Sequence, residues 1–241
     1  MIDNITQIKD NVGISPLVAR SSAKGYEAAA GRLPCFIMKA NVYVDGFNLY
    51  YGAVKGTPYR WLNIARMCEL LLPNDHIHQI KHFTALVNPR PHDIDQRARQ
   101  QSYLRALRTL PNITIVLGSF LTHEVMMHLA PPATGFAKVI KTEEKGSDVN
   151  IATHLLVDAF NNDFEIAIVI SNDSDLLLPI QIVTQQFHKP VGLLNPQKYP
   201  SKALLPHVAF IKQIRPGVLA KSLFPATLTD KRGSFSKPAS W

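Results

Sequence analysis

The amino-acid sequence predicts an α/β fold in which an open, mainly parallel β-sheet carries helices on both faces. Short apolar runs alternate along the chain with longer stretches of helical periodicity, an order that favours a parallel sheet. The apolar runs are nearly continuous, as expected of strands that are buried on both faces. A length of 241 residues suits one sizeable domain with flanking segments.

The first half of the domain is expected to begin with a strand that ends at Asp45, within the stretch VYVDGFN. Residues 61–73 space their apolar side chains as a helix, which Pro73 stops. A strand, a helix and a further strand are then expected over residues 80–87, 94–110 and 113–120.

The second half is predicted from clearer patterns after one ambiguous segment. Residues 121–143 are interpreted as an excursion that ends in a short strand at AKVIKT, residues 137–142. A helix, a fully buried strand, a helix and a last strand are then expected over residues 147–160, 164–171, 175–187 and 190–195.

Changes in composition divide the chain into three parts. Residues 1–39 are small and polar with weak periodicity and are expected to form a flexible extension. The α/β domain is expected over residues 40–214. Residues 215–241 carry half of the formal net charge of +8 and are interpreted as a basic tail that packs on the domain.

Charge and cysteine usage restrict the class of partner. A net charge of +8 suggests a polyanionic partner such as a nucleic acid. Cys35 and Cys68 have no paired spacing, so we expect neither a disulfide framework nor a zinc site, and we expect a cytoplasmic location. No apolar run approaches the ~18 residues that span a bilayer, and residues 1–37 do not resemble a signal peptide, so no membrane partner is expected.

Acidic side chains follow two of the expected strands at the point where each strand ends. Asp45 closes the first strand, and SNDSD brings Asp173 and Asp175 after the strand 164–171. A third source is EKGSD, in which Gly146 permits a sharp turn and Asp148 enters the first turn of the next helix. Ligands of open α/β sheets bind at the carboxyl ends of the strands, so both strand ends are candidate site positions.

A helical wheel for residues 147–160 places Asp148 beside the face expected to be buried. That face is interpreted as Val149, Ala152, Leu156, Ala159 and Phe160, and the opposite side as Asn150, His154 and Asn161. If the first and fourth strands are neighbours, they lie about 4.8 Å apart and their ends meet.

Four carboxylates would then converge, and their mutual repulsion would destabilise the fold unless a cation compensates it. Oxygen ligands of this kind select Mg²⁺ or Mn²⁺ over zinc. A divalent ion at this place can activate a water molecule and orient a phosphodiester. Asn48, one turn after Asp45, offers an amide that can orient a ligand.

Each acid also has a purely structural interpretation. Ser171, Asn172, Asp173 and Ser174 are all residue types that cap helices, and Asp148 complements a helix dipole. These explanations account for the acids one by one but not for their shared edge of the sheet.

Three stretches together resemble the NYN domain family, PIN-like ribonuclease relatives that include LabA and DUF88 proteins. VDGFNLY, EKGSDVNIATHLLVDAF and VISNDSDLLLPI are similar to the three motif blocks of that family, in the same order, and YLRAL and KPASW are also similar. The resemblance covers roughly residues 40–241.

The resemblance implies a PIN-like, Rossmann-related sheet and a metal-dependent endoribonuclease that uses Mg²⁺ or Mn²⁺. The family acids fall on Asp45, Asp148, Asp173 and Asp175, with Asn48 as their polar partner. One departure is Asn172, which stands where many members have glycine before the DSD triplet.

Several basic residues are candidates for binding RNA, expected to be single-stranded. On the helix 94–110, Arg97, Gln101, Arg105 and Arg108 share one side, which is either a phosphate-binding stripe or an ordinary solvated face. Lys145 precedes Asp148 closely enough to touch a phosphate beside the metal. In the tail, basic and aromatic side chains are candidates for binding RNA through charge and stacking. For Phe224 and Trp241, packing on the domain is the alternative that we favour.

Two other functions stay open on the sequence alone. A protein of the same fold that binds RNA without turnover, as a regulator or adaptor, would keep the same acids. DSD also resembles the metal-binding triplet of nucleotide-sugar transferases, although that reading leaves Asp45 and Asp148 without a role. The chain shows no dinucleotide or Walker fingerprint, and it leaves open a homo-oligomer or a protein partner.

Overall fold

The computed structural model describes residues 37–89, 91 and 93–241. The expected extension over residues 1–39 therefore lies outside the described residues except for its last three. Within the described residues, no helix is both long enough and apolar enough to cross a membrane.

The centre of the structure is a six-stranded sheet in the order β3-β2-β1-β6-β7-β8. All neighbouring strands pair in parallel, which confirms the expected open α/β sheet. The pairing of β1 with β6 confirms that the first and fourth strands of the sheet are neighbours. The strands are β1 (Lys39–Asp45), β2 (His76–Thr84), β3 (Ile113–Leu117), β6 (Ile166–Ile170), β7 (Val191–Asn195) and β8 (Phe210–Gln213).

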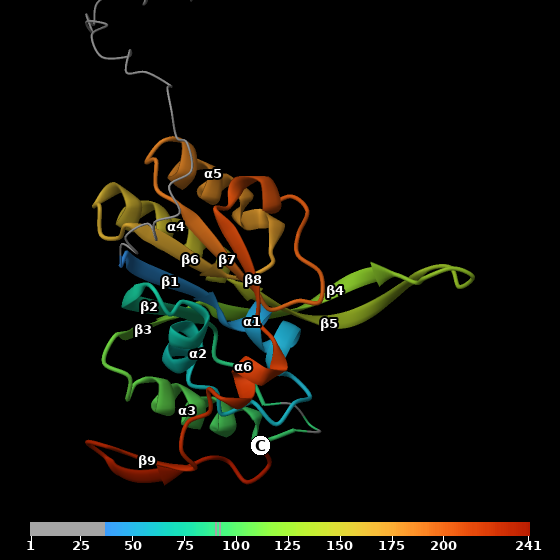
Figure 1. Cartoon of the computed structure of the whole chain (residues 1–241). Coiled ribbons are helices and arrows are strands. Elements are labelled where there is room, and N and C mark those ends of the chain that lie inside the picture. Colours follow the sequence, from blue (N-terminus) through green and yellow to red (C-terminus); the bar gives the residue numbers. More distant parts are fainter. Residues whose placement is uncertain (1–36, 90, 92) are drawn as a thin grey trace, which may run out of the picture. The chain divides into compact units, whose positions relative to one another are not determined.

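Helices cover both faces of this sheet, as Figure 1 shows. One face carries α4 (Ser147–Phe160) and α5 (Leu177–Gln185), and the other carries α2 (Ile64–Leu71), α3 (Gln96–Leu107) and α6 (Pro216–Ala220). The shorter helices are α1 (Gly46–Leu49), the π-helix η1 (Tyr50–Val54), and the 3-10 turns η2 (Ser174–Leu176) and η3 (Leu205–His207).

The apolar runs of the sequence supply two cores because side chains alternate across each strand. In β1, Val42 and Val44 pack towards α2 and α3, whereas Tyr43 packs towards α4 and α5. In β6, Ile168 and Val169 divide between the two cores in the same way. Burial on both faces explains why these strands read as continuous apolar runs.

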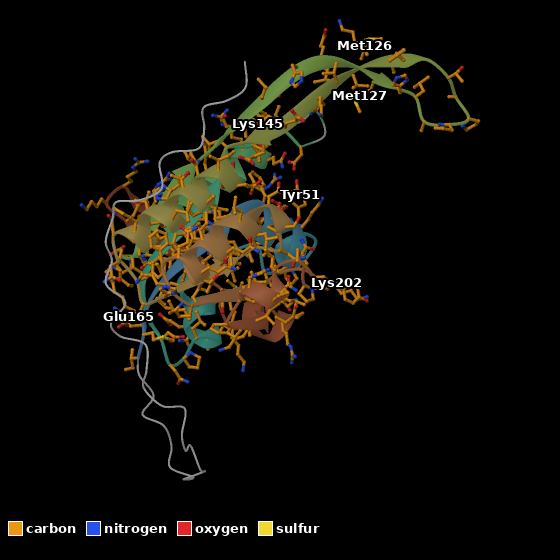
Figure 2. The ribbon with its side chains drawn as sticks, turned by 90° about the horizontal axis from the view of Figure 1, so that it is seen from above. Tyr51, Met126, Met127, Lys145, Glu165 and Lys202 are labelled. Atoms are coloured by element: carbon orange, nitrogen blue, oxygen red, sulfur yellow. The ribbon has the colours of Figure 1, made fainter. Side chains whose placement is uncertain are left out.

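The segment after β3 forms an antiparallel hairpin that is separate from the main sheet. Its strands are β4 (Ser119–His128) and β5 (Phe136–Lys145), which pair along their whole length. The expected short strand at 137–142 was therefore too short, and the strand expected over 113–120 is divided at Gly118. Met126 and Met127 lie exposed on the outer part of the hairpin (Figure 2).

The helix 147–160 has the predicted ends, but the predicted buried face was only partly right. Ala159 is buried as expected, whereas Val149 and Phe160 are 68% and 77% exposed, and Ile151 and Leu155 are buried in addition. The wheel grouped the apolar residues nearest Asp148, whereas the helix places several apolar side chains in solvent. Asp148 still lies beside the buried side, because Ile151 and Leu155 are one and two turns further along.

The tail turns back onto the domain. Phe224 is buried in the core beneath α2 and α6, and the Trp61 Nε1 donates a hydrogen bond to the Pro225 carbonyl over 2.8 Å. The ring of Trp241 lies 6.3 Å from that of Trp61. The tail also forms a small antiparallel hairpin of β9 (Thr227–Asp230) and β10 (Gly233–Ser236).

A buried charged group ties α4 to the sheet. Asp158 Oδ2 accepts hydrogen bonds from Tyr43 Oη over 2.6 Å and from Lys81 Nζ over 2.5 Å, and the side chains of Asp158 and Lys81 are about nine-tenths buried. Burial, followed by the bond to Asp158, raises the pKa of Tyr43, so the phenol stays protonated.

Replacing Lys81 by methionine is expected to destabilise the fold by about 3–5 kcal/mol, because Asp158 would keep a buried charge without its cation. Urea unfolding measures this loss. The double variant Lys81→Met with Asp158→Leu removes both charges and should recover much of the stability. A single variant as stable as the parent protein would contradict the role of this ion pair.

Candidate functional site: a carboxylate cleft

Asp45 is held firmly at the carboxyl end of β1. As the cap of α1 it accepts a hydrogen bond from the Asn48 backbone N–H over 2.9 Å, and its second oxygen accepts one from Ser171 Oγ over 2.9 Å. Asp45 is only 5% exposed. Burial raises its pKa most, with smaller increases from Asp173 and Glu144, while the two hydrogen bonds oppose the rise.

Asp173 follows the neighbouring strand β6 and is held in a similar way. Its carboxylate accepts a hydrogen bond from the Asp175 backbone N–H over 2.9 Å and caps the turn η2. Ser171 links the two acids, because its hydroxyl donates to Asp45 and accepts from the Asp173 backbone N–H over 3.1 Å. Asp173 therefore caps η2 and also lines the cleft that it shares with Asp45.

Asp148 arrives from a third direction, in the first turn of α4. The turn before it needs Gly146, whose φ of 98° lies in the left-handed region that favours glycine. Its carboxylate makes no hydrogen bond or ion pair with any described residue. Burial, together with the charges of Asp45, Asp173, Glu144 and Asp175, raises its pKa to about 6.

Glu144 is a further acid of this site that the sequence interpretation did not single out. It stands near the end of β5 and accepts hydrogen bonds from the Ser147 backbone N–H over 3.1 Å and from Ser147 Oγ over 2.8 Å. The available signal was its place in EKGSD, three residues before the serine that opens α4.

These acids line one cleft of about 850 Å³ at the carboxyl ends of β1 and β6. From β1 the chain builds the sheet outward through β2 and β3, then returns to β6 and builds in the other direction. The cleft thus lies where the strand order reverses, as is typical of ligand sites in open α/β sheets. Its polar lining includes Asp45, Asn48, Glu144, Asp148, Asp173 and Gln197.

Asn48 and Asn172 hold the loops around the cleft. Asn48 Oδ1 accepts hydrogen bonds from the Asn172 backbone N–H over 3.2 Å and from Gln197 Nε2 over 3.4 Å. The side chain of Asn172 joins the loop after β7, donating to the Tyr199 carbonyl and accepting from the Ser201 N–H. The residue that departs from the family glycine therefore fixes a loop beside the acids.

Asp175 and Lys145 lie at the edge of this arrangement. Asp175 is exposed and does not line the cleft, although its charge contributes to the raised pKa of Asp148. Lys145 is exposed at the base of the hairpin, as Figure 2 shows, and pairs with Glu143 over 3.1 Å.

The expected basic stripe on α3 is not part of the cleft. Arg105 donates to both oxygens of Asp230, over 2.8 and 2.7 Å, and its guanidinium lies over the ring of Phe235. These hydrogen bonds lower the pKa of Asp230 to about 2. Arg105 thus anchors the tail. Arg105 and Arg108 line another cavity, which Asp230 of the tail also lines. Arg97 is exposed and does not line the carboxylate cleft.

The model of the NYN domain matches residues 39–212, which is most of the chain. The chain belongs to the NYN domain family. This match confirms the resemblance of the three motif blocks, and the parallel sheet agrees with the PIN-like fold of the family, which typically consists of nucleases that depend on divalent metals.

Two further comparisons place the NYN chain among known proteins. It is 26% identical over 236 residues to a 6-hydroxy-3-succinoylpyridine 3-monooxygenase of Pseudomonas putida, covering 85% of this chain and 75% of that protein. A crystal structure of a protein of unknown function from Vibrio parahaemolyticus superposes with a TM-score of 0.52 at 17% identity, covering 78% of this chain and 97% of that one. The second likeness concerns the fold alone.

The donor chemistry of the cleft fits a hard divalent cation. The available ligands are carboxylate and amide oxygens, which Mg²⁺ and Mn²⁺ prefer. Among the described residues, no group of three or more His, Cys, Asp or Glu side chains is placed so that it could hold a metal ion. Mg²⁺ usually keeps several water molecules and binds through one or two carboxylates, so a complete protein cage is not required.

Replacing Asp148 by asparagine is expected to stabilise the metal-free NYN protein at pH 8. The folded pKa of about 6 lies above the usual value of 3.8, so the folded state carries an unfavourable charge above pH 6 and regains the proton as the pH falls. The advantage of the variant should therefore shrink towards pH 4. Thermal unfolding in EDTA at both pH values measures it, and an equal advantage at both would contradict the raised pKa of Asp148.

Proposed function

We propose that this NYN protein is a metal-dependent endoribonuclease that hydrolyses RNA phosphodiester bonds with Mg²⁺ or Mn²⁺ in the carboxylate cleft. The observation that supports it most is the meeting of Asp45, Glu144, Asp148 and Asp173 in one cleft at the point where the strand order reverses. Burial, with a smaller contribution from the neighbouring acids, raises the pKa of Asp45 and Asp148, so a bound cation would offset an unfavourable charge that the fold itself leaves in place.

The acids would bind the ion in different ways. Asp45 and Asp173 are oriented by hydrogen bonds and would offer fixed oxygens, whereas both oxygens of Asp148 are free to bind the ion directly or through water. Asp175, at the edge, would act through water. When bound, a divalent ion supplies Lewis-acid stabilisation of the phosphodiester and activation of the attacking water.

Asn48 would orient the substrate. Its carbonyl oxygen already accepts hydrogen bonds from Asn172 and Gln197, which fixes the plane of the amide. Its NH₂ group remains to donate to a phosphate oxygen. Loops held by hydrogen bonds at the cleft reduce the reorganisation that catalysis would otherwise require.

The substrate class follows from charge. A net charge of +8 favours a polyanion, and Lys145 and Arg97 are exposed cations that would contact phosphates of single-stranded RNA. Arg105 and Arg108 are less suited because they lie in the separate cavity beside the tail. A cytoplasmic location, where cysteines such as Cys68 stay reduced, is part of the same proposal.

The test is cleavage of labelled single-stranded RNA by the purified protein with Mn²⁺, with Mg²⁺ and with EDTA. Cleavage should require the divalent ion and should fall about a hundredfold or more in Asp45→Asn and Asp173→Asn. Asp75→Asn is the matched control, because Asp75 lies just before β2, at the amino ends of the parallel strands and away from the cleft at their carboxyl ends.

Cleavage that survives both cleft substitutions, or that persists in EDTA, would contradict the proposal. Tight RNA binding without cleavage under either ion would instead favour the non-catalytic RNA-binding role. Retention of nucleotide sugars but not of RNA would favour the transferase.

A second candidate comes from the name of the relative, which acts as a monooxygenase on a substituted pyridine. The observation in its favour is the extent of the match, 85% of this chain and 75% of the relative. Oxygen consumption with 6-hydroxy-3-succinoylpyridine and an added two-electron reductant would support it. RNA cleavage without such consumption would exclude it as the main activity.

A further inference from the structure

A second cavity, of about 340 Å³, opens beside the carboxylate cleft. It lies between the helical segment α1–η1 and helix α3, with His82 and Thr84 of β2 among its lining residues. Phe47, Tyr51, Val87 and Gln96 line both this cavity and the carboxylate cleft, so the two are contiguous. Its volume lies in the range of small-molecule sites.

The cavity has an aromatic lining. The aromatic side chains are Phe47, Tyr50, Tyr51, Tyr103 and Trp241. Tyr51 is 53% exposed and is labelled in Figure 2, and it stands on the π-helix η1. π-Helical turns often occur at functional sites, and aromatic faces of this kind favour stacking with a flat ring.

The same cavity gathers buried polar atoms that have no partner. Five buried side-chain polar atoms of the described residues lack a hydrogen-bond partner, and three belong to residues that line this cavity: Arg60 Nε, His82 Nδ1 and Gln96 Oε1. Buried polar atoms in folded proteins are nearly always hydrogen-bonded, so such a concentration points to a missing partner. Arg60 Nε donates, Gln96 Oε1 accepts, and a neutral imidazole nitrogen does either.

The charges of the cavity lining are only partly compensated, because Lys55 and Arg60 also line it and neither forms an ion pair with another described residue. Arg99, which also lines it, donates to both oxygens of Asp93 over 2.6 Å, so its charge is already compensated. His82 is 5% exposed, and burial lowers its pKa to about 4, so its ring is neutral near pH 7. A flat ring with donors and acceptors on its edge fits the neutral histidine and the aromatic side chains of this lining.

We propose that this cavity binds one planar nitrogen heteroaromatic ring, stacked on Tyr51 and hydrogen-bonded at its edge by Arg60, His82 and Gln96. A nucleobase has this chemistry, because every base presents a flat face and an edge with donors and acceptors. A base seated here would belong to a nucleotide whose neighbouring phosphate reaches the contiguous carboxylate cleft. This assignment of the ring to RNA rests on the proposed function, whereas the ring chemistry itself does not.

The experiment measures binding in EDTA, where cleavage does not occur. Calorimetry with adenosine, uridine and 2-pyridone tests free rings, and a short single-stranded RNA is compared with copies that carry one abasic position. The cavity variants are Tyr51→Ala and Gln96→Leu. Their matched controls are Phe160→Ala, an exposed aromatic at the far end of α4, and Gln101→Leu, an exposed glutamine of α3.

We expect at least one free ring to bind, with affinity reduced about tenfold or more in both cavity variants and within about twofold in both controls. Loss of affinity at one abasic position, absent in the cavity variants, identifies the ring as an RNA base. Binding of 2-pyridone that depends on the cavity, with no abasic effect, identifies a free heteroaromatic molecule. Failure of every ring to bind, or binding unchanged in both cavity variants, overturns the proposal, whereas absent RNA cleavage with intact ring binding overturns only the nuclease assignment.

Discussion

The crowding of carboxylates at the carboxyl ends of β1 and β6 is the constraint on which the rest of the site depends. Asp45 is nearly buried, and its orientation is fixed by Asn48 and Ser171. Ser171 couples it to Asp173 through one hydroxyl. The backbone therefore directs these carboxylates into one cleft. Burial, with a smaller contribution from the neighbouring acids, raises the pKa of Asp45 and Asp148 there.

Two acids on one helix show how different this site is from the rest of the fold. Asp158 accepts hydrogen bonds from Lys81 and Tyr43, so its charge is compensated within the core. Asp148, ten residues earlier on α4, has no hydrogen-bond or ion-pair partner among the described residues. Asp158 stabilises the attachment of α4 to the sheet, whereas Asp148 is left with oxygens that a cation can use. Proteins tolerate such unfavourable groups mainly where function requires them.

The sequence was sufficient to predict the strands that are buried on both faces. Strands β1 and β6 are continuous apolar runs because both of their faces are covered, and their parallel pairing brings Asp45 and Asp173 together without further information. The β4–β5 hairpin was not predictable to the same degree, because neither strand contains a fully buried residue and the alternation of exposure along each strand is incomplete. The contact of Arg105 with the tail could not be predicted for a different reason, since its partner Asp230 is 125 residues away. Glu144 and the unpaired atoms of the second cavity emerge only from the three-dimensional arrangement.

The most direct test is a crystal of the protein grown with Mn²⁺ and measured for anomalous scattering. We expect a strong peak in the cleft, within ligand distance of Asp45, Asp148 or Asp173 or joined to them by ordered water. At saturating Mn²⁺, a cleft without such a peak would show that the gathered carboxylates do not serve to bind a cation.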